Sequence, residues 1–232
     1  MIPLIPYRFT YLIGSVIFMI PWLILYLLRK DIRAEMLMMS ILMAFASFIT
    51  GYLFWTIDWW QPETITGTKV GIEDLILGFA NGGVAAAIYE EIFKKHFSRR
   101  RHDKNKIKLV ILILFSIIFI FYLFYIIRLT SFLASAIVMT LFGILILYLR
   151  RDLVLDAIVS GLLMAIVSIP VYLILEIVSP GWIDKTWLYS FLSEIKILGI
   201  PIEDLIFYFL AGFIAGPFYE TWQGYRLIES EK

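Results

Sequence analysis

The stretch LVILILFSIIFIFYLFYII, from Leu109 to Ile127, contains no charged residue over its whole length. A helix needs about 20 consecutive apolar residues to cross the hydrocarbon core of a bilayer, so this stretch predicts a membrane-spanning helix. The rest of the chain agrees, because 61% of its 232 residues are hydrophobic and only 17% are charged. A water-soluble domain of this length has too little interior to hide so much apolar surface. We therefore predict an integral membrane protein.

Six further apolar stretches predict an all-α polytopic membrane protein with seven transmembrane helices. The predicted spans are residues 9–28, 36–57, 72–93, 108–127, 129–149, 153–178 and 201–222. If the spans alternate in direction, 15 of the 20 Lys and Arg residues lie on one side of the membrane. The positive-inside rule then places the N-terminus outside and the C-terminus in the cytoplasm, which we expect for a multi-pass protein of a prokaryotic plasma membrane.

The most basic segment, KKHFSRRRHDKNKIK at residues 94–108, allows two interpretations. It resembles the basic runs that bind nucleic acid, but it also falls at a cytoplasmic turn between two spans. A topology-setting loop that contacts anionic lipid headgroups explains both its charge and its place. We therefore expect membrane lipid, and no nucleic acid, as a partner.

Two acidic segments of similar sequence, GIEDLILGF at residues 71–79 and PIEDLIFYF at residues 201–209, share six of nine residues. Further matches, at offsets of 130 or 121 residues, join Tyr89-Glu90 to Tyr219-Glu220 and Leu28–Asp31 to Leu149–Asp152. These matches indicate two copies of a three-span unit. The additional span at residues 108–127 gives both copies the same orientation, which predicts two parallel three-helix repeats joined by a linker helix, a 3+1+3 arrangement.

The expected division follows from these repeats. Residues 1–98 form the first repeat, residues 99–128 form the basic cytoplasmic loop and linker helix, and residues 129–232 form the second repeat.

Each acidic segment places a glutamate and an aspartate side by side at the start of a span, Glu73-Asp74 and Glu203-Asp204. An ionised carboxylate costs about 2.5–3.5 kcal/mol at a helix centre in a membrane, so intramembrane acids usually have a function. A protonated acid could act as a general acid and an ionised neighbour as a base. The alternative is helix capping, which needs one carboxylate rather than a repeated pair. Glu176, near the outer end of the sixth span, is either a further catalytic carboxylate or an interfacial residue.

Residues near the acids are candidates to line a binding site. These substrate-binding candidates are Trp55, Phe79, Asn81, Phe207 and Phe209. Each has a structural alternative: interhelical hydrogen bonding for the asparagine, an aromatic belt for the tryptophan, and packing or lipid contact for the phenylalanines.

Three acids at the cytoplasmic ends of spans, Glu90, Asp156 and Glu220, are expected to be interfacial and partnered by nearby basic residues.

Several chemistries have no sequence support. The chain has no cysteine, and its two histidines, His96 and His102, lie in the basic loop, so no metal site is predicted within the membrane. No glycine-rich nucleotide motif is present, and no cofactor is expected. The seventh span contains no lysine, which excludes a retinal Schiff base.

The repeated Glu-Asp motif resembles that of the membrane lycopene cyclase domain family, a flavin-independent type found as two small subunits or as one fused chain. The family motif is Pro-x-Glu-(Glu/Asp) at the start of a helix, once in each half. Residues 201–204 fit it fully, and residues 71–74 fit it except that Gly71 replaces proline. The seven-span frame also matches the fused form, so the resemblance covers nearly the whole chain.

The resemblance implies a carotenoid end-group cyclase that converts lycopene to a β-ring carotenoid, an intramolecular lyase or isomerase reaction by acid/base carbocation chemistry without a cofactor. Glu73, Asp74, Glu203 and Asp204 would be its catalytic acids, with donor and acceptor left open, and lycopene or a related polyene its substrate. Contact with other enzymes of carotenoid synthesis is a further expectation. The alternatives are a small SWEET-like proton- or ion-coupled transporter and a non-catalytic carotenoid- or lipid-binding protein.

Overall fold

The computed structural model describes residues 3–98 and 106–229. Among these residues, seven helical segments are long and apolar enough to cross a membrane. They are α1 (Tyr7–Leu28), α2 (Arg33–Thr50) continued by η1 (Gly51–Trp55) and α3 (Thr56–Asp58), α4 (Ile72–Ile92), α5 (Lys106–Phe121) continued by η2 (Tyr122–Ile126), α6 (Ser131–Leu149), η3 (Arg151–Leu153) with α7 (Val154–Val178), and α9 (Ile202–Gln223). The predicted spans agree with these helices to within three residues at every end, which confirms the seven-helix membrane protein.

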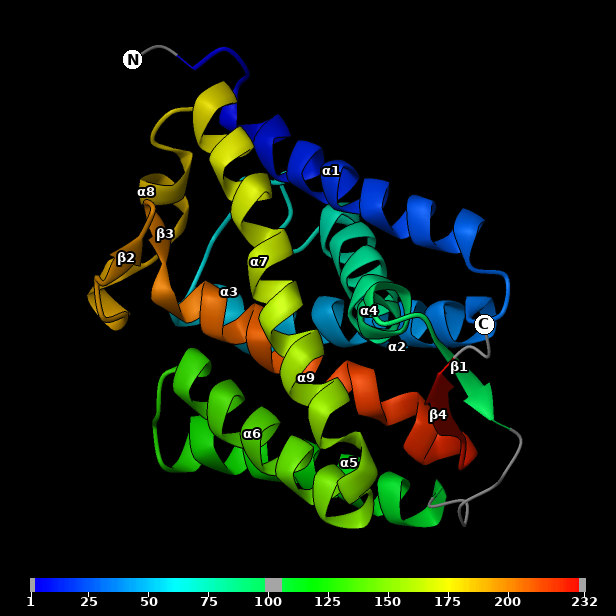
Figure 1. Cartoon of the computed structure of the whole chain (residues 1–232). Coiled ribbons are helices and arrows are strands. Elements are labelled where there is room, and N and C mark those ends of the chain that lie inside the picture. The colour runs from blue at the N-terminus through cyan, green and yellow to red at the C-terminus, as the bar shows by residue number, and fades with distance from the viewer. Residues whose placement is uncertain (1–2, 99–105, 230–232) are drawn as a thin grey trace.

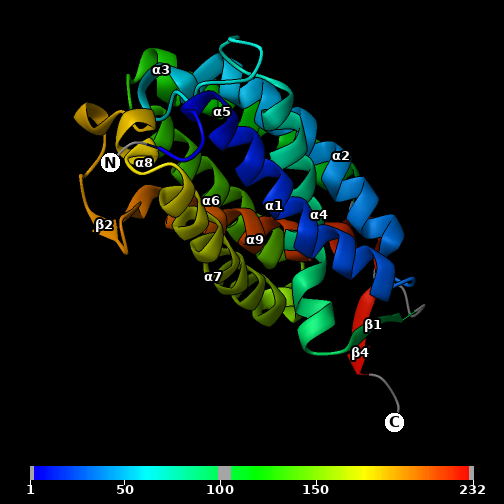
Figure 2. The same ribbon diagram turned by 90° about the horizontal axis from the view of Figure 1, so that it is seen from above.

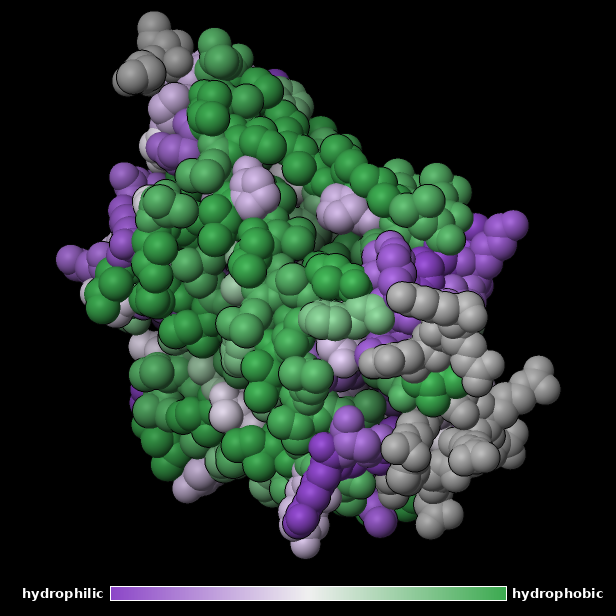
Figure 3. All heavy atoms as spheres, in the orientation of Figure 1, coloured by the Kyte–Doolittle hydropathy of each residue, from purple (hydrophilic) through white to green (hydrophobic). Residues whose placement is uncertain are grey.

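The outer surface of the bundle matches a lipid environment. Large apolar side chains are exposed along α1, α2, α5, α6 and α7. Figure 3 shows a continuous hydrophobic face, with hydrophilic residues gathered at the edge over β2 and at the opposite edge near β1 and β4. A surface of this kind would be unstable in water and is stable in hydrocarbon, so the chain is an integral membrane protein.

Two helices, α4 and α9, form the centre of the bundle. They are the most buried of the seven segments, they contact each other, and their flanking helices differ. Helix α4 packs against α1 and α2, whereas α9 packs against α6 and α7 (Figures 1 and 2). Helix α5 lies on the outside, packs mainly on α6, and buries only Leu109.

Glycines allow the central helices to approach their neighbours at the distance of backbone contact. A Cβ atom added at Gly82 of α4 would lie 2.5 Å from the carbonyl oxygen of Met39 in α2. A Cβ atom at Gly212 of α9 would lie 2.4 Å from the carbonyl oxygen of Ser160 in α7. Small residues at such crossings are a general device of membrane helix packing. The two crossings occupy equivalent positions in the two matching halves of the sequence.

Loops cover the N-terminal ends of α4 and α9. The longer one contains α8 (Trp182–Thr186), η4 (Tyr189–Phe191) and the hairpin of β2 (Lys196–Ile197) with β3 (Ile200–Pro201). Two backbone hydrogen bonds join it to the shorter loop: Gln61 N–H donates to the Thr186 carbonyl at 2.8 Å, and Leu188 N–H to the Trp59 carbonyl at 2.8 Å. The loops therefore form one connected cover.

At the opposite end, β1 (Lys95–Ser98), which follows α4, pairs antiparallel with β4 (Arg226–Glu229), which follows α9. The predicted division after residue 98 and the middle of the basic segment, residues 99–105, lie at or outside the edge of the described residues.

Candidate active site

A cavity of about 400 Å³ lies inside the bundle, beneath the loop cover. Its wall is almost entirely apolar and comes from α1, α2, α4, α5, α6, α7 and α9. Two carboxyl groups are in this wall, those of Asp74 and Asp204. The cavity thus combines what ligand sites usually combine, an apolar wall and a few polar groups that converge on it.

Asp204, in the first turn of α9, is 5% exposed and is held by three donors from three segments. Its Oδ1 accepts the indole N–H of Trp59 at 3.2 Å and of Trp187 at 3.0 Å. Its Oδ2 accepts the hydroxyl of Tyr172 from α7 at 2.6 Å. One oxygen is therefore occupied by two groups that can only donate, and the other faces a hydroxyl that can donate or accept.

Asp74, at the equivalent position in α4, has a related but different set of partners. Its Oδ1 accepts the hydroxyl of Tyr11 from α1 at 2.9 Å, and its Oδ2 accepts the backbone N–H of Gly71 at 2.8 Å. The second bond caps the helix, so Asp74 both caps α4 and lines the cavity. Before α9, Pro201 occupies the position that Gly71 has before α4. Proline has no backbone N–H to donate, so the oxygen of Asp204 is free to accept the two indole N–H groups.

The neighbouring glutamates are buried but turn away from the cavity. Glu73 Oε1 accepts the backbone N–H of Ile65 at 2.6 Å, and Glu203 Oε1 accepts that of Ser193 at 2.7 Å. Each therefore fixes the loop that precedes its own helix. Glu176 behaves similarly, since its Oε1 accepts the N–H of Gly181 at 2.6 Å. Of the five carboxylates singled out in the sequence, only the two aspartates line the cavity.

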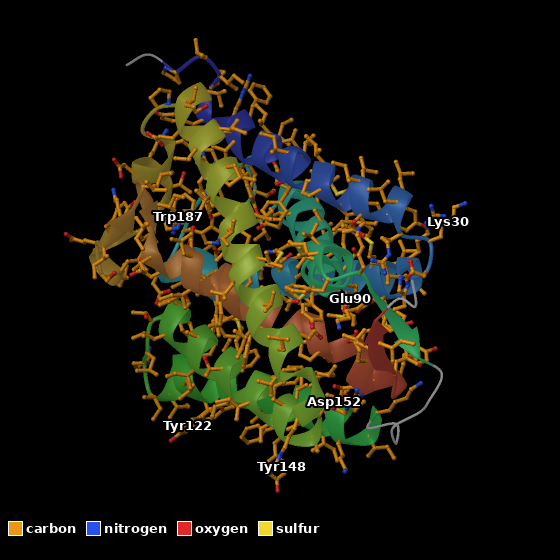
Figure 4. All side chains as sticks on the ribbon, in the orientation of Figure 1. Lys30, Glu90, Tyr122, Tyr148, Asp152 and Trp187 are labelled. Carbon is orange, nitrogen blue, oxygen red and sulfur yellow. The ribbon has the colours of Figure 1, made fainter. Side chains whose placement is uncertain are left out.

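Aromatic rings connect the surroundings of the two aspartates. Tyr11 packs edge-on against Trp60 with centroids 5.0 Å apart, and Trp60 packs against Trp187 at 5.7 Å. Trp187, shown in Figure 4 on the loop before α9, donates to Asp204. The two aspartates are thus linked by a continuous chain of aromatic contacts in the wall and cover of one cavity.

The predicted lining residues divide into two groups. Trp55, Asn81 and Phe207 line the cavity, and Phe207 packs edge-on against both Trp55 and Trp59. The π-helical turn η1 carries Trp55, and such turns often occur at functional sites. Phe79 and Phe209 point elsewhere: Phe79 packs on Trp22, and Phe209 packs on α7 and Phe213.

Three groups at the cavity were not predicted from the sequence: Tyr11, Tyr172 and Trp187, which bind the aspartates. Tyr208, which adjoins Phe207 in the sequence below the second acidic pair, lines the wall and stacks on Phe18. Tyr11 and Tyr172 lie near the ends of predominantly apolar spans, where a tyrosine is ordinarily an interfacial residue. One feature of the sequence could have identified these two tyrosines: both lie at the same depth in the predicted membrane as the acidic pairs.

The wall of the cavity includes Leu42 and Ala46 of α2 and Ile117 of α5, all of which are exposed. We infer from these residues that the cavity opens on the apolar surface between α2 and α5. Because exposed apolar residues line both sides, a hydrophobic molecule can pass from the hydrocarbon layer into the cavity without crossing a polar surface.

In a comparison with protein families, a family model described as lycopene cyclase matches residues 5–92 and 130–222. These segments make up most of the chain and leave out residues 93–129, which include α5. No curated protein and no solved structure matches the chain.

Proposed function

The chain belongs to the lycopene cyclase family, and on that premise we propose that it cyclises the acyclic end group of lycopene, or of a related polyene, to a β-ring. The observation that carries the proposal is the pair of buried aspartates in one apolar cavity that opens to lipid. The reaction adds a proton to the end group, forms one carbon–carbon bond and removes another proton. There is no net oxidation, so the reaction needs no redox cofactor.

We assign the general acid to Asp204. Protonating a terminal double bond leaves a carboxylate in an apolar cavity, where an anion without donors is strongly destabilised. Asp204 has three donors already aimed at it, from Trp59, Trp187 and Tyr172, and such preorganised donors stabilise the charge that the proton transfer creates. The proton would reside on Oδ2, since both groups on Oδ1 are obligate donors.

The remaining steps use the rest of the cavity. The protonated end group carries a tertiary cation, a second double bond attacks it to close the ring, and a base then removes a ring proton. Asp74 is the second carboxyl group in the wall and the proposed base. The faces of Trp55, Tyr208 and Phe207 can stabilise the cation between these steps, because aromatic faces attract positive charge.

Glu73, Glu203 and Glu176 have a different proposed role. Each accepts a backbone N–H from a loop of the cover. They are positioning residues, which hold the cover closed over the cavity and keep water from the cation.

The entry route and the topology complete the proposal. The cavity has room for an end group, so the remainder of the polyene would extend between α2 and α5 into the hydrocarbon layer.

We further propose that residues 1–98 and 129–232 are parallel three-helix repeats joined by α5, with the N-terminus outside and the C-terminus in the cytoplasm. In this orientation the aspartates lie near the outer face.

The test is expression in a lycopene-accumulating bacterial host, with chromatography of the extracted pigments. The unchanged chain should give monocyclic or bicyclic product. Asp204→Asn should reduce cyclic product by at least about 100-fold at equal protein level, because it removes the acid. Glu194→Gln changes an exposed acid of the loop cover and serves as the control, with product unchanged.

Retention of cyclic product by Asp204→Asn would contradict the assignment of the acid. Absence of cyclic product from the unchanged, membrane-inserted protein would contradict the cyclase itself. The family match does not favour the transporter.

A further inference from the structure

A second group of buried acids lies at the other end of the central helices. It consists of Glu35 in α2, Glu90 in α4, Asp156 in α7 and Glu220 in α9. Their exposed fractions are 0%, 0%, 2% and 0%. From the sequence we expect Glu90, Asp156 and Glu220 to be interfacial and paired with basic residues, and this prediction is wrong because all three side chains are buried inside the bundle. Figure 4 shows Glu90 in the interior, on the side of β1 and β4.

Few groups donate to the side-chain oxygens of this cluster. Within residues 3–98 and 106–229, no N–H group and no hydroxyl group donates to either oxygen of Glu35, Glu90 or Glu220, and the carboxyl groups of Glu90 and Glu220 lie within hydrogen-bonding reach of each other. Asp156 Oδ1 accepts the hydroxyl of Ser160 at 3.0 Å, and its Oδ2 has no donor. A buried carboxylate without donors is strongly unfavourable, so the cluster needs positive charge or protons from another source.

Two arginines beside the cluster, Arg29 and Arg150, are hydrogen-bonded to other groups. Arg29 donates to the Glu90 and Lys95 carbonyls and forms a two-bond pair with Asp31. Arg150 is bonded in the same way to the Glu220 and Tyr225 carbonyls and to Asp152. The hydrogen bonds from Arg29 lower the pKa of the Asp31 carboxyl group to about 2, so the positive charge of Arg29 stabilises the carboxylate of Asp31. These guanidinium groups therefore hydrogen-bond the backbone beside the cluster and none of its carboxylate oxygens, and they attract the negative charge of the cluster only from a longer distance.

The geometry of the glutamates suits a bound ion. One oxygen atom of each of Glu35, Glu90 and Glu220 lies within 4.8 Å of the other two. Oxygen ligands of Mg²⁺ or Ca²⁺ lie about 2.0–2.6 Å from the ion and hence at most about 5 Å from one another. The donors are all carboxylate oxygens, which favour Mg²⁺, Mn²⁺ or Ca²⁺ over metals that prefer sulfur or imidazole.

We propose that Glu35, Glu90 and Glu220 bind one hard divalent cation, with Asp156 beside them as a further acidic group. The ion would join α2, α4 and α9 at one end of the bundle. Sixteen residues of α4, about 24 Å of helix, separate Glu90 from Asp74. The site is therefore distinct from the cavity, and the proposal does not depend on the proposed cyclase.

The test uses the purified full chain in lipid nanodiscs, treated with EDTA and then titrated with MnCl₂. Electron paramagnetic resonance of Mn²⁺ should show about one bound ion per chain. The melting temperature should rise by about 5–10 °C at saturating Mn²⁺. Glu220→Gln and Glu35→Gln should lose the bound ion and the temperature shift, whereas the exposed Glu194→Gln should keep both.

The measurement on the unchanged chain keeps the proposal falsifiable even if a variant fails to fold. If Mn²⁺, Mg²⁺ and Ca²⁺ leave the melting temperature of this chain unchanged and no Mn²⁺ is bound, the proposal is overturned, and protons shared between the carboxyl groups must stabilise the cluster.

Discussion

At the scale of the residue, the difference between Gly71 and Pro201 decides how the two aspartates are held. Gly71 has an N–H group and donates it to Asp74, so this oxygen is used in capping. Pro201 has no backbone N–H group, and the indole N–H groups of Trp59 and Trp187 donate to Asp204 instead. The presence or absence of this one backbone N–H group thus distinguishes the two sites, and Asp204 has three donors where Asp74 has two.

The tyrosine donor to Asp204 gives a prediction at the same scale. Tyr172→Phe removes the hydroxyl that bonds Oδ2 at 2.6 Å and keeps the ring. Loss of one preorganised donor typically lowers kcat about 100-fold, so we expect a decrease of this order in the rate of cyclic product formation. Pigment analysis at matched protein level measures the change.

Tyr148→Phe is the matched control, because Tyr148 is 71% exposed on α6 and distant from the cavity. Equal rates for the two variants would show that the Tyr172 hydroxyl has no part in the reaction.

At the scale of the element, each central helix meets its partner through a glycine. Gly212→Ala would place a Cβ atom 2.4 Å from the Ser160 carbonyl oxygen. The backbone cannot rotate away as a side chain can, so we expect a loss of about 1–3 kcal/mol in the free energy of unfolding. Thermal unfolding in detergent or nanodiscs should show the lower melting temperature.

Gly14→Ala in α1 is the control, since its new Cβ atom would meet only the movable end of the Leu175 side chain. A Gly212→Ala variant as stable as Gly14→Ala would mean that α7 and α9 can separate without loss.

The helices were predictable and their side-chain partners were not. Each span is set by a local property, its run of apolar residues, and this explains the close agreement at residues 72–93 and 201–222. The bond between Trp187 and Asp204 depends on a loop that folds back over the bundle, which no local pattern encodes. Glu90 was expected at the surface because it ends its span, but β1 and β4 lie beyond that helix end.

At the scale of the whole molecule, polar residues mark two opposite edges of an apolar body. The loop cover over the aspartates forms one edge, and the β1–β4 pair is at the other. The excess of Lys and Arg on the second side predicts that it faces the cytoplasm.

The chain has no cysteine, so single cysteines can report this orientation. A membrane-impermeant maleimide should label Glu194→Cys in intact cells and Lys30→Cys only after the cells are opened. Both positions are exposed, so access to the reagent depends only on the side of the membrane. The reverse labelling pattern would show that the N-terminus is inside.

The pairing of β1 with β4 has a consequence for how the halves stay together. His96 lies opposite Ile228 and Phe97 opposite Leu227, so a strand that ends one half is matched in register to a strand that ends the other. A nick between Ser98 and Lys106 would leave each fragment with its own strand of this ladder. The two fragments would then still be able to associate through this paired sheet, and an unbroken peptide chain between Ser98 and Lys106 would not be needed for their association.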